Sequence, residues 1–374
     1  MKFRGLLLAP LAFGATLVAG QQNADPGKAF VDALTASGLT MLSQVVTNFT
    51  QAIGPVLAKG GNMTLLAPTN AAFKKLGSMP SAQQLPAILA YHLVNGSLSY
   101  ENLHKAPGNR IVAPTELIGS PLVNMLQQPQ VVVVQASNST SDKAEIPNPL
   151  ADEVASFENT TDGPRLGNVL IQPIDHFLTI PGNLSSILQE EDDLSTIRAL
   201  LDRNQTVDIL SSTPSITLFA PEDKAVANAT GALSKATTQD IANILANHVL
   251  NGTVAYTAWI QSGQIKADQT SASGESVKFR TEGNETFVST GSIEARIIKA
   301  DILTNNGVVH VVDRVLVNTQ SNPAAAATAA DTARKNSTSK SSQGGHKDAS
   351  TPSPNISAAA VSAAFIIAAF YLTM

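Results

Sequence analysis

The stretch TLLAPTNAAF at residues 64–73 decides the fold, because the chain repeats its form as TLFAPEDKAV at residues 217–226. In each copy a short apolar run, typical of a buried strand, ends at a proline, which cannot donate a hydrogen bond to a sheet. A helical pattern follows, and the Thr69 hydroxyl is placed to cap the first free N–H groups of that helix. Two copies of this strand, corner and helix predict two modules, and nothing in the unit is chemically reactive.

A second pattern, a helix with one apolar face and a histidine near its end, also occurs twice. It follows the i, i+3, i+4, i+7, i+8 rule of an amphipathic helix at Leu85, Ile88, Leu89, His92 and Leu93, and again at Ile241, Ile244, Leu245, His248 and Val249. An Asn-Gly pair follows each helix, at 95–96 and 251–252, and predicts a left-handed glycine at the helix end.

A third block closes module 2 with the sequence NGVVHVVDRVL at residues 306–316, which predicts a turn entering a strand. Its counterpart in module 1 is GNVLIQPIDHFL at residues 167–178. The counterpart has two more residues between its glycine and its aspartate, which predicts a bulge or kink at Pro173.

Taken together, these three blocks resemble the fasciclin domain. The resemblance covers residues 28–181 (module 1) and 182–320 (module 2), each about the usual size of one domain. It implies an α+β fold of two tandem fasciclin-like modules, each a β-sandwich or wedge flanked by helices. Three positions of module 2 depart from the family pattern, which has tyrosine at Asn247, threonine at Glu222 and phenylalanine at Val226. These departures bear on whether both modules do the same job.

The two ends of the chain carry targeting patterns. Lys2 and Arg4 precede an apolar run and small residues, so residues 1–20 are predicted to be a secretory signal peptide. Residues 321–355 are rich in Ala, Ser and Thr without apolar periodicity, which predicts a disordered, O-glycosylated stalk. Residues 356–374 are an apolar tail with no basic residue after it, which predicts a GPI-anchor signal with attachment at Gly344 or a neighbour. A single-pass membrane helix is the alternative.

Sequons for N-glycosylation are spread over both modules and beyond. Such a density on a chain with a signal peptide predicts a heavily glycosylated surface. The acceptor asparagines are Asn48, Asn62, Asn95, Asn138, Asn159, Asn183, Asn204, Asn228, Asn251, Asn284, Asn336 and Asn355.

The search for reactive chemistry predicts no catalytic residue, no cofactor site and no metal site. The chain has no cysteine, which excludes cysteine nucleophiles and thiolate zinc sites. Hydrolase elbows, phosphate-binding loops and metalloprotease helices are absent from the sequence. His92, His248 and His310 are interpreted as buried histidines bonded to backbone, with metal ligation or general-base chemistry as the alternative. The acids Asp152, Glu153 and Glu158 fall in residues 137–163, a stretch interpreted as a surface loop.

Partner classes follow from charge and aromatic content. The net charge of −5, without basic patches, argues against nucleic acid as a partner. Tyr256 and Trp259 come nearest to a sugar-stacking platform, but packing is the preferred role for the tryptophan.

The resemblance implies extracellular adhesion without catalysis. Together with the signal-peptide, stalk and anchor patterns, it predicts a protein on the extracellular face of the plasma membrane or in the cell wall of a fungus or a similar walled organism. Its partners would be matrix or wall components, other surface glycoproteins or a second copy, and a lipid anchor would hold it to the membrane. In some members of the family, the segment around a Tyr-His motif takes part in receptor binding, and the matching residues here are Tyr91, His92, Asn247 and His248. We prefer the interpretation that these four residues hold the fold, because the helix pattern places His92 on the inward face. Two other functions stay open: a structural wall glycoprotein, and a small-ligand-binding or enzymatic surface protein.

Overall fold

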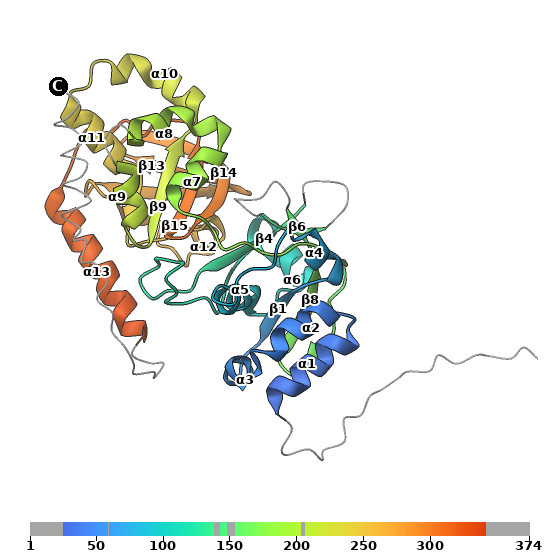
Figure 1. Ribbon diagram of the computed structural model, residues 1–374. Helices are drawn as coiled ribbons and strands as arrows, with labels where there is room; N and C mark the ends of the chain where they lie inside the picture. Colours follow the sequence, from blue (N-terminus) through green and yellow to red (C-terminus); the bar gives the residue numbers. More distant parts are fainter. Residues whose placement is uncertain (1–24, 59, 138–142, 148–153, 203–205, 342–374) are drawn as a thin grey trace, which may run out of the picture.

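The computed structural model describes residues 25–58, 60–137, 143–147, 154–202 and 206–341, and it shows two α+β halves (Figure 1). The predicted α+β class is therefore confirmed. The names module 1 and module 2 are kept for the two halves.

Module 1, with the residues that lead into it, contains most of the first half of the chain. Its helices are α1 (Pro26–Ala36), α2 (Thr40–Thr47), α3 (Thr50–Ala58), α4 (Asn70–Lys75), α5 (Leu85–His92), α6 (Tyr100–Lys105) and the 3-10 turn η1 (Pro107–Asn109). Its strands are β1 (Met63–Pro68), β2 (Leu93–Asn95), β3 (Arg110–Pro114), β4 (Val131–Ala136), β5 (Ala144–Ile146), β6 (Ala155–Ser156), β7 (Arg165–Leu166) and β8 (Val169–Ile174).

Module 2 repeats the same order with a longer sheet. Its helices are α7 (Leu184–Glu190), η2 (Asp192–Leu194), α8 (Ser195–Asp202), α9 (Thr206–Ser212), α10 (Asp223–Leu233), α11 (Thr238–Asn247) and α12 (Thr257–Gln261), and α13 (Pro323–Ser341) follows the module. Its strands are β9 (Ile216–Pro221), β10 (Val249–Asn251), β11 (Asp268–Thr270), β12 (Ser276–Glu282), β13 (Glu285–Thr290), β14 (Ile293–Thr304) and β15 (Gly307–Val312).

Within the described residues, the strands form two sheets in module 1 and a single sheet in module 2. Module 1 has a sheet of order β2-β1-β8-β7 and a second of order β3-β4-β5-β6. In module 2 the long strand β14 pairs with both β15 and β13, through register shifts between Ile297 and Ile302, so that one sheet of order β10-β9-β15-β14-β13-β12-β11 results. In both modules the repeated strand lies parallel to the closing strand, β1 with β8 and β9 with β15.

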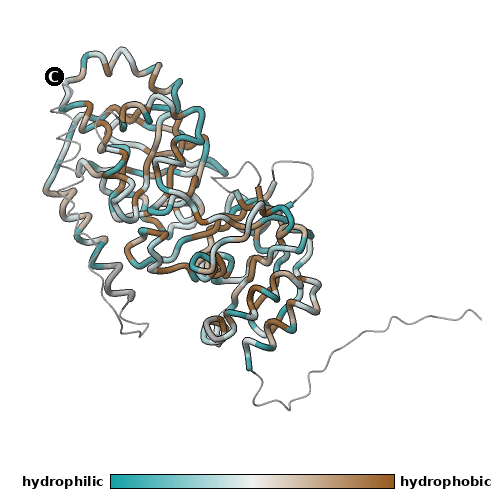
Figure 2. The backbone as a smooth tube through the Cα atoms, viewed as in Figure 1, coloured by the Kyte–Doolittle hydropathy of each residue, from teal (hydrophilic) through white to brown (hydrophobic). Residues whose placement is uncertain are grey.

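The repeated strand is the centre of each core, because its side chains alternate between two apolar layers. In β1, Met63 and Leu65 pack with the helical layer of α1 and α2, whereas Leu66 faces the second sheet. In β9, Ile216 and Leu218 pack with helices α7, α8 and α9, whereas Phe219 faces the side chains of β12 and β13. Figure 2 shows this apolar character along the central strands of both modules. The predicted buried strand ending at a proline is confirmed in both copies.

The predicted helix start after β1 is confirmed as well. Thr69 is the N-cap of α4, and its hydroxyl oxygen accepts a hydrogen bond from the Ala72 N–H at 3.2 Å. In module 2 the N-cap of α10 is Glu222, whose side chain makes no capping hydrogen bond.

The predicted bulge at Pro173 is wrong. Strand β8 pairs with β1 in continuous register from Val169 to Ile174, and Pro173 lies opposite Ala67 without a shift. The closing aspartates align, but the glycines do not: Gly167 lies in the turn between β7 and β8, whereas Gly307 is the first residue of β15. The longer spacing from glycine to aspartate in module 1 therefore arises because its glycine lies in the hairpin turn, whereas that of module 2 lies in the strand.

The Asn-Gly pairs do contain left-handed glycines, with φ of 104° at Gly96 and 77° at Gly252. Their predicted place at a helix end is wrong, because a short strand, β2 or β10, separates each glycine from its helix. The chain turns from helix directly into strand after His92.

The interpretation of residues 137–163 as a surface loop is wrong where strands β5 and β6 form. Ala144, Ile146, Ala155 and Phe157 are buried in the core between the two sheets of module 1. Their alternation of apolar and polar residues is the local signal of a strand, although each run is only two or three residues long.

The predicted stalk is also wrong in its first part, because residues 323–341 form helix α13 (Figure 1). Pro323 begins the helix, the Asn322 side chain accepts a hydrogen bond from the Ala325 N–H, and the alanines that follow favour helix strongly. Ala326 and Ala330 are buried, and α13 contacts β10 and β11. No helix in the described part of the chain is long and apolar enough to cross a membrane. The predicted signal peptide at 1–20, the rest of the stalk, Gly344 and the tail at 356–374 lie outside the described residues.

Candidate functional site

His92, the histidine of the motif in module 1, joins the end of α5 to the chain that follows β8. Its Nδ1 lies 2.8 Å from the Ile88 carbonyl oxygen, and its Nε2 accepts a hydrogen bond from the Leu178 N–H at 3.0 Å. A backbone carbonyl can only accept, so the ring carries its proton on Nδ1 and is neutral. Both ring nitrogens are therefore used within the fold.

His248 makes the same two bonds in module 2. Its Nδ1 lies 2.7 Å from the Ile244 carbonyl oxygen, and its Nε2 accepts from the Leu316 N–H at 3.0 Å. Burial lowers the pKa of both His92 and His248 to about 4, because the charged imidazolium is poorly solvated in the interior. The interpretation of these histidines as buried and bonded to backbone is confirmed, and we call the pair the histidine clamps.

The residues that precede the clamps, Tyr91 and Asn247, differ in type but are both anchored inside. The Tyr91 hydroxyl donates to the Val131 carbonyl oxygen at 3.2 Å, which ties α5 to β4. The Asn247 amide donates to the Asn318 carbonyl oxygen at 2.9 Å, and its oxygen accepts from the hydroxyl of Ser273 at 2.6 Å. Asn247 thus anchors the segment that leads to α13.

All four residues of the predicted motif are buried: Tyr91 is 4% exposed, His92 1%, Asn247 0% and His248 2%. A macromolecular partner does not reach these side chains while the modules are folded. Their contacts are those of residues that hold the fold.

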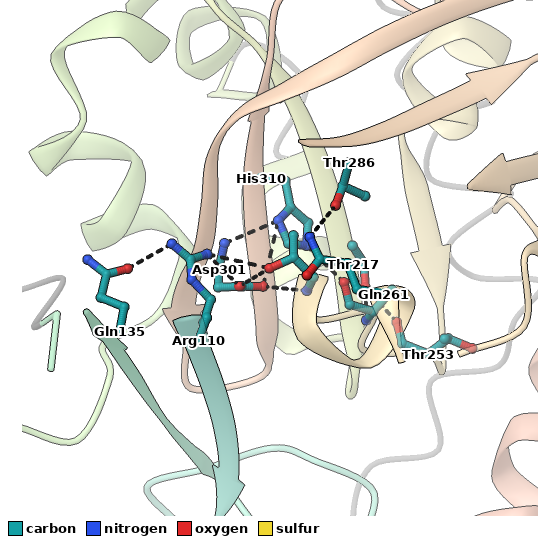
Figure 3. A network of polar contacts seen from close by, with 10 residues as sticks. Arg110, Gln135, Thr217, Thr253, Gln261, Thr286, Asp301 and His310 are labelled. Carbon is teal, nitrogen blue, oxygen red and sulfur yellow. Dashed lines mark hydrogen bonds and ion pairs between the residues drawn. The ribbon is translucent and has the colours of Figure 1, made fainter. Parts of the chain in front are cut away.

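A polar network that the sequence did not reveal lies between the modules, around Asp301 on β14 (Figure 3). This buried carboxylate accepts hydrogen bonds from the Thr257 N–H at 2.8 Å, from the Thr257 hydroxyl, and from the Arg110 guanidinium at 2.8 Å. Asp301 has φ of +59°, in the left-handed region that few residues other than glycine adopt. The backbone conformation aims the carboxylate at the end of β3 of module 1.

Arg110 supplies the opposite charge from module 1, 191 positions away in the sequence. Its second nitrogen donates to the Gln135 side-chain oxygen at 2.7 Å, so both β3 and β4 hold the guanidinium in place. The Arg110 side chain is 24% exposed and that of Asp301 is fully buried. A charge pair of this kind is costly to break, because the remaining partner stays desolvated.

His310 completes the network on the module 2 side. Its Nδ1 accepts a hydrogen bond from the Asp301 N–H at 3.2 Å, and its Nε2–H donates to the Ala255 carbonyl oxygen at 3.0 Å. Burial lowers the pKa of His310, outweighing the opposing effect of the Asp301 charge. The ring is neutral, and both of its nitrogens are hydrogen-bonded to backbone, as predicted for a buried histidine in a valine-rich strand.

The rest of the junction is mostly apolar. Val112 and Val133 of module 1 pack with Tyr256 and Leu303 of module 2 in one cluster. Trp259 lies at its edge, with its ring edge-on to Tyr256 at 4.8 Å and its Nε1 donating to the Val112 carbonyl oxygen at 3.4 Å. Because Tyr256 is fully buried, these two aromatic residues offer no open platform for a sugar.

The junction offers few groups for catalysis or metal binding. A cavity of about 120 Å³ lies beside the network, lined by Arg110, Thr257, Gln261 and Thr286 among others. Within the described residues no group of three His, Asp or Glu side chains is placed to hold a metal ion. Of the three acids considered in the sequence, Glu158 is exposed, and Asp152 and Glu153 lie outside the described residues.

The sequon asparagines whose side chains the structure describes lie at the surface. Asn48, Asn62, Asn95, Asn159, Asn183, Asn228 and Asn284 are exposed, and Asn251 is half-buried. The two equivalent sites differ, because a side-chain carbon at Gly252 would lie 2.5 Å from Ala333 of α13, whereas the space around Gly96 is open. Asn138, Asn204 and Asn355 lie outside the described residues, as does the side chain of Asn336.

Comparison with known proteins gives matches across both modules. A fasciclin domain model matches residues 29–146 and 192–318. A fasciclin-like arabinogalactan protein of Arthroderma benhamiae is 26% identical over 276 residues, covering 70% of this chain and 60% of that protein. A second such protein, from Phaeosphaeria nodorum, is 25% identical over 268 residues, covering 68% of this chain and 78% of that protein. Human periostin is 29% identical over 154 residues, covering 40% of this chain and 18% of periostin.

This chain thus spans 60% of the length of the first of these relatives and 18% of periostin. Among solved structures, a FAS1 domain pair from the insect cell adhesion molecule fasciclin I aligns with 76% of this chain and 98% of its own. The TM-score is 0.37 and the sequence identity 16%.

Proposed function

Because the chain belongs to the fasciclin domain family, we propose that it is a non-catalytic surface glycoprotein whose two modules mediate adhesion. The ligands would be wall or matrix components, other surface glycoproteins or a second copy of the chain. The module bounds proposed are 28–181 and 182–320. A signal peptide at 1–20 would direct secretion, and the tail at 356–374 would be exchanged for a lipid anchor near Gly344, holding the protein at the outer face of the membrane or in the wall.

The observation that carries this proposal is the contrast between the surface and the interior. Every sequon asparagine whose side chain is described has access to solvent, from Asn48 to Asn284, as glycan attachment requires. His92 and His248, whose pKa values are lowered to about 4, use both ring nitrogens in hydrogen bonds to backbone, so neither ring is free to act as an acid or a base. Solvent access of the sequon asparagines fits a glycosylated adhesion module. An enzyme would instead need titratable groups with shifted pKa that are free to react with a substrate.

The burial of the motif residues moves the proposed contact surface elsewhere. Two exposed apolar side chains, Ile118 at 48% and Leu122 at 38%, belong to the same loop, between β3 and β4. Exposed apolar side chains on a loop are typical of interaction sites. We include this loop in the proposed adhesion surface.

Bead adhesion tests the proposal. Beads coated with the purified protein, before and after enzymatic removal of N-glycans, are counted for attachment to source cells and to one another. We expect attachment to survive deglycosylation and to fall in an Ile118→Ser, Leu122→Ser variant. The matched control is Ile298→Ser, which changes a similarly exposed isoleucine (41%) on β14.

Two outcomes would contradict this expectation. Attachment that disappears with the glycans would favour a structural wall glycoprotein that acts through its sugar coat. An absence of attachment in both states would remove the adhesion function altogether.

A further inference from the structure

Two phenylalanine rings fill the space beside the histidine clamp of module 1. Phe73 on α4 and Phe177 after β8 contact each other edge to face, with ring centroids 4.7 Å apart. Phe177 also lies 5.3 Å from the His92 ring. Both phenylalanines belong to the core that joins α1 and α2 to the sheet.

Module 2 has valine at both equivalent positions. Val226 follows Pro221 at the distance at which Phe73 follows Pro68. Val315 precedes Leu316, the residue that donates to His248, as Phe177 precedes Leu178, the donor to His92. Two aromatic rings are therefore absent from this part of the module 2 core.

The neighbouring residues do not refill the space. The α11 side chains that face it, Ile241, Ile244 and Leu245, match Leu85, Ile88 and Leu89 of α5 in size. A cavity of about 380 Å³ remains, lined mainly by apolar side chains of α8, α10 and α11. This volume is in the range of small-molecule binding sites, roughly 300–1,000 Å³.

The length of α10 also distinguishes the two modules. Helix α4 ends at Lys75, after six residues, whereas α10 continues for eleven residues to Leu233. The additional turns bring Leu233 and Ala236 to the wall of the cavity. Helices α10 and α11 lie at the end of module 2 that is remote from module 1 (Figure 1), so this cavity is separate from the junction network.

The chemistry of the walls selects the kind of occupant. The residues that line the cavity carry no formal charge, and both ring nitrogens of His248 are bonded to backbone. Thr196 and Thr238 are the other polar residues of the lining. A charged group inside would be desolvated without a partner, whereas a hydrocarbon group would gain contacts with the isoleucines, leucines and valines.

We propose that module 2 binds a neutral, hydrocarbon-rich small molecule in the cavity between α8, α10 and α11, in the space that Phe73 and Phe177 fill in module 1. This binding is independent of the proposed adhesion surface. It makes module 2 the ligand-carrying half of the chain.

Fluorescence titration of the full chain with N-phenyl-naphthylamine, a neutral apolar probe, tests the proposal. We expect saturable binding of one probe per chain and displacement by decanol but not by decanoate. The variant Val226→Phe, Val315→Phe restores the two rings of module 1 and is expected to weaken binding at least about tenfold, because the rings occupy the ligand's place. Ile298→Phe adds a ring on the exposed face of β14 and is expected to leave binding unchanged.

Methyl NMR of the wild-type chain is a second measurement that does not depend on the folding of the double variant. Decanol is expected to shift the signals of Ile197, Leu200 and Ile241, which line the cavity, and to leave those of module 1 in place. Absence of saturable binding, unchanged affinity in a folded Val226→Phe, Val315→Phe variant, displacement by decanoate as strong as by decanol, or shifts spread over both modules would overturn the proposal.

Discussion

The two modules of this chain share their scaffold residue by residue and differ at a few positions next to it. Each keeps a threonine in its central strand, Thr64 or Thr217, whose hydroxyl accepts a hydrogen bond from the chain after the Asn-Gly turn, and each keeps the histidine clamp. The shared residues are buried and bonded to backbone. Repetition within one chain therefore identifies the residues that hold the fold.

The differences lie where each module has a task of its own. His310 of module 2 corresponds by strand register to Gln172 of module 1, and Asp301, just before the pairing of β14 with β15, corresponds to Gly163, just before the pairing of β7 with β8. The same short contact is kept, since the Gly163 N–H donates to the Gln172 side-chain oxygen at 3.4 Å as the Asp301 N–H donates to His310 at 3.2 Å. Module 2 alone has a carboxylate there, and that carboxylate binds Arg110 of module 1. The difference teaches that one position beside the closing strand serves folding in one module and assembly in the other.

The largest effect is expected from Asp301→Ala, which removes the acceptor for Thr257 and leaves the Arg110 guanidinium without its partner. The free energy of unfolding should fall by about 3–5 kcal/mol, because a partly buried charge stays uncompensated. Urea denaturation of the full chain measures this change.

Two further variants isolate the cause. Asp301→Asn removes the charge but keeps a residue that tolerates positive φ, so it separates the lost ion pair from backbone strain. Glu294→Ala breaks the solvent-exposed pair between Arg280 and Glu294 and should change stability little. If Asp301→Ala costs no more than Glu294→Ala, the junction network does not stabilise the chain.

Acidification should affect the two modules unequally. A histidine with a folded pKa of about 4 and an unfolded pKa near 6.5 binds fewer protons when folded, so its stabilisation is complete above pH 6.5 and is lost as the pH falls toward 4. The loss is about 1.4 kcal/mol per pH unit for each histidine. At pH 5 the clamp of each module should thus have lost about 2 kcal/mol.

Module 2 should lose more, because His310 is a second buried histidine with a lowered pKa, and Gln172 stands in its place in module 1. Hydrogen exchange of core amides at pH 7 and pH 5, read separately for each module, measures the difference. His310→Gln should make the stability that module 2 loses between pH 7 and pH 5 more similar to the loss in module 1. Equal losses in the wild-type modules, or a stability that does not change between pH 7 and pH 5, would contradict this reasoning.

Features set by local pattern or repetition were predictable from the sequence. The buried strand ending at Pro68, the cap at Thr69 and the inward face of His92 each depend on residues within a few positions of one another. The absence of phenylalanine at Val226 was also visible, because the repeat supplies its own reference.

Features set by distant residues were not predictable. Arg110 and Asp301 are 191 positions apart, and nothing near either residue indicates a charge pair. The match between Phe177 and Val315 requires the register of β8 and β15, which the misplaced glycines of the closing blocks obscured. Helix α13 was missed because its packing against β10 and β11, together with alanine propensity, outweighs a composition typical of a stalk.

The smallest effect concerns the helix that follows the central strand in each module. Thr69→Ala removes the hydrogen bond to the Ala72 N–H and should destabilise module 1 by about 1 kcal/mol. Glu222→Ala should cost module 2 less, since the Glu222 side chain makes no capping bond to α10. The reciprocal change, Glu222→Thr, supplies the hydroxyl that module 1 uses and should stabilise module 2 by up to about 1 kcal/mol. Urea denaturation of the three variants compares them directly, with an unchanged slope showing that only stability has changed. Equal costs for Thr69→Ala and Glu222→Ala, or a loss of stability in Glu222→Thr, would mean that this corner is held by the proline and the strand instead of by its cap.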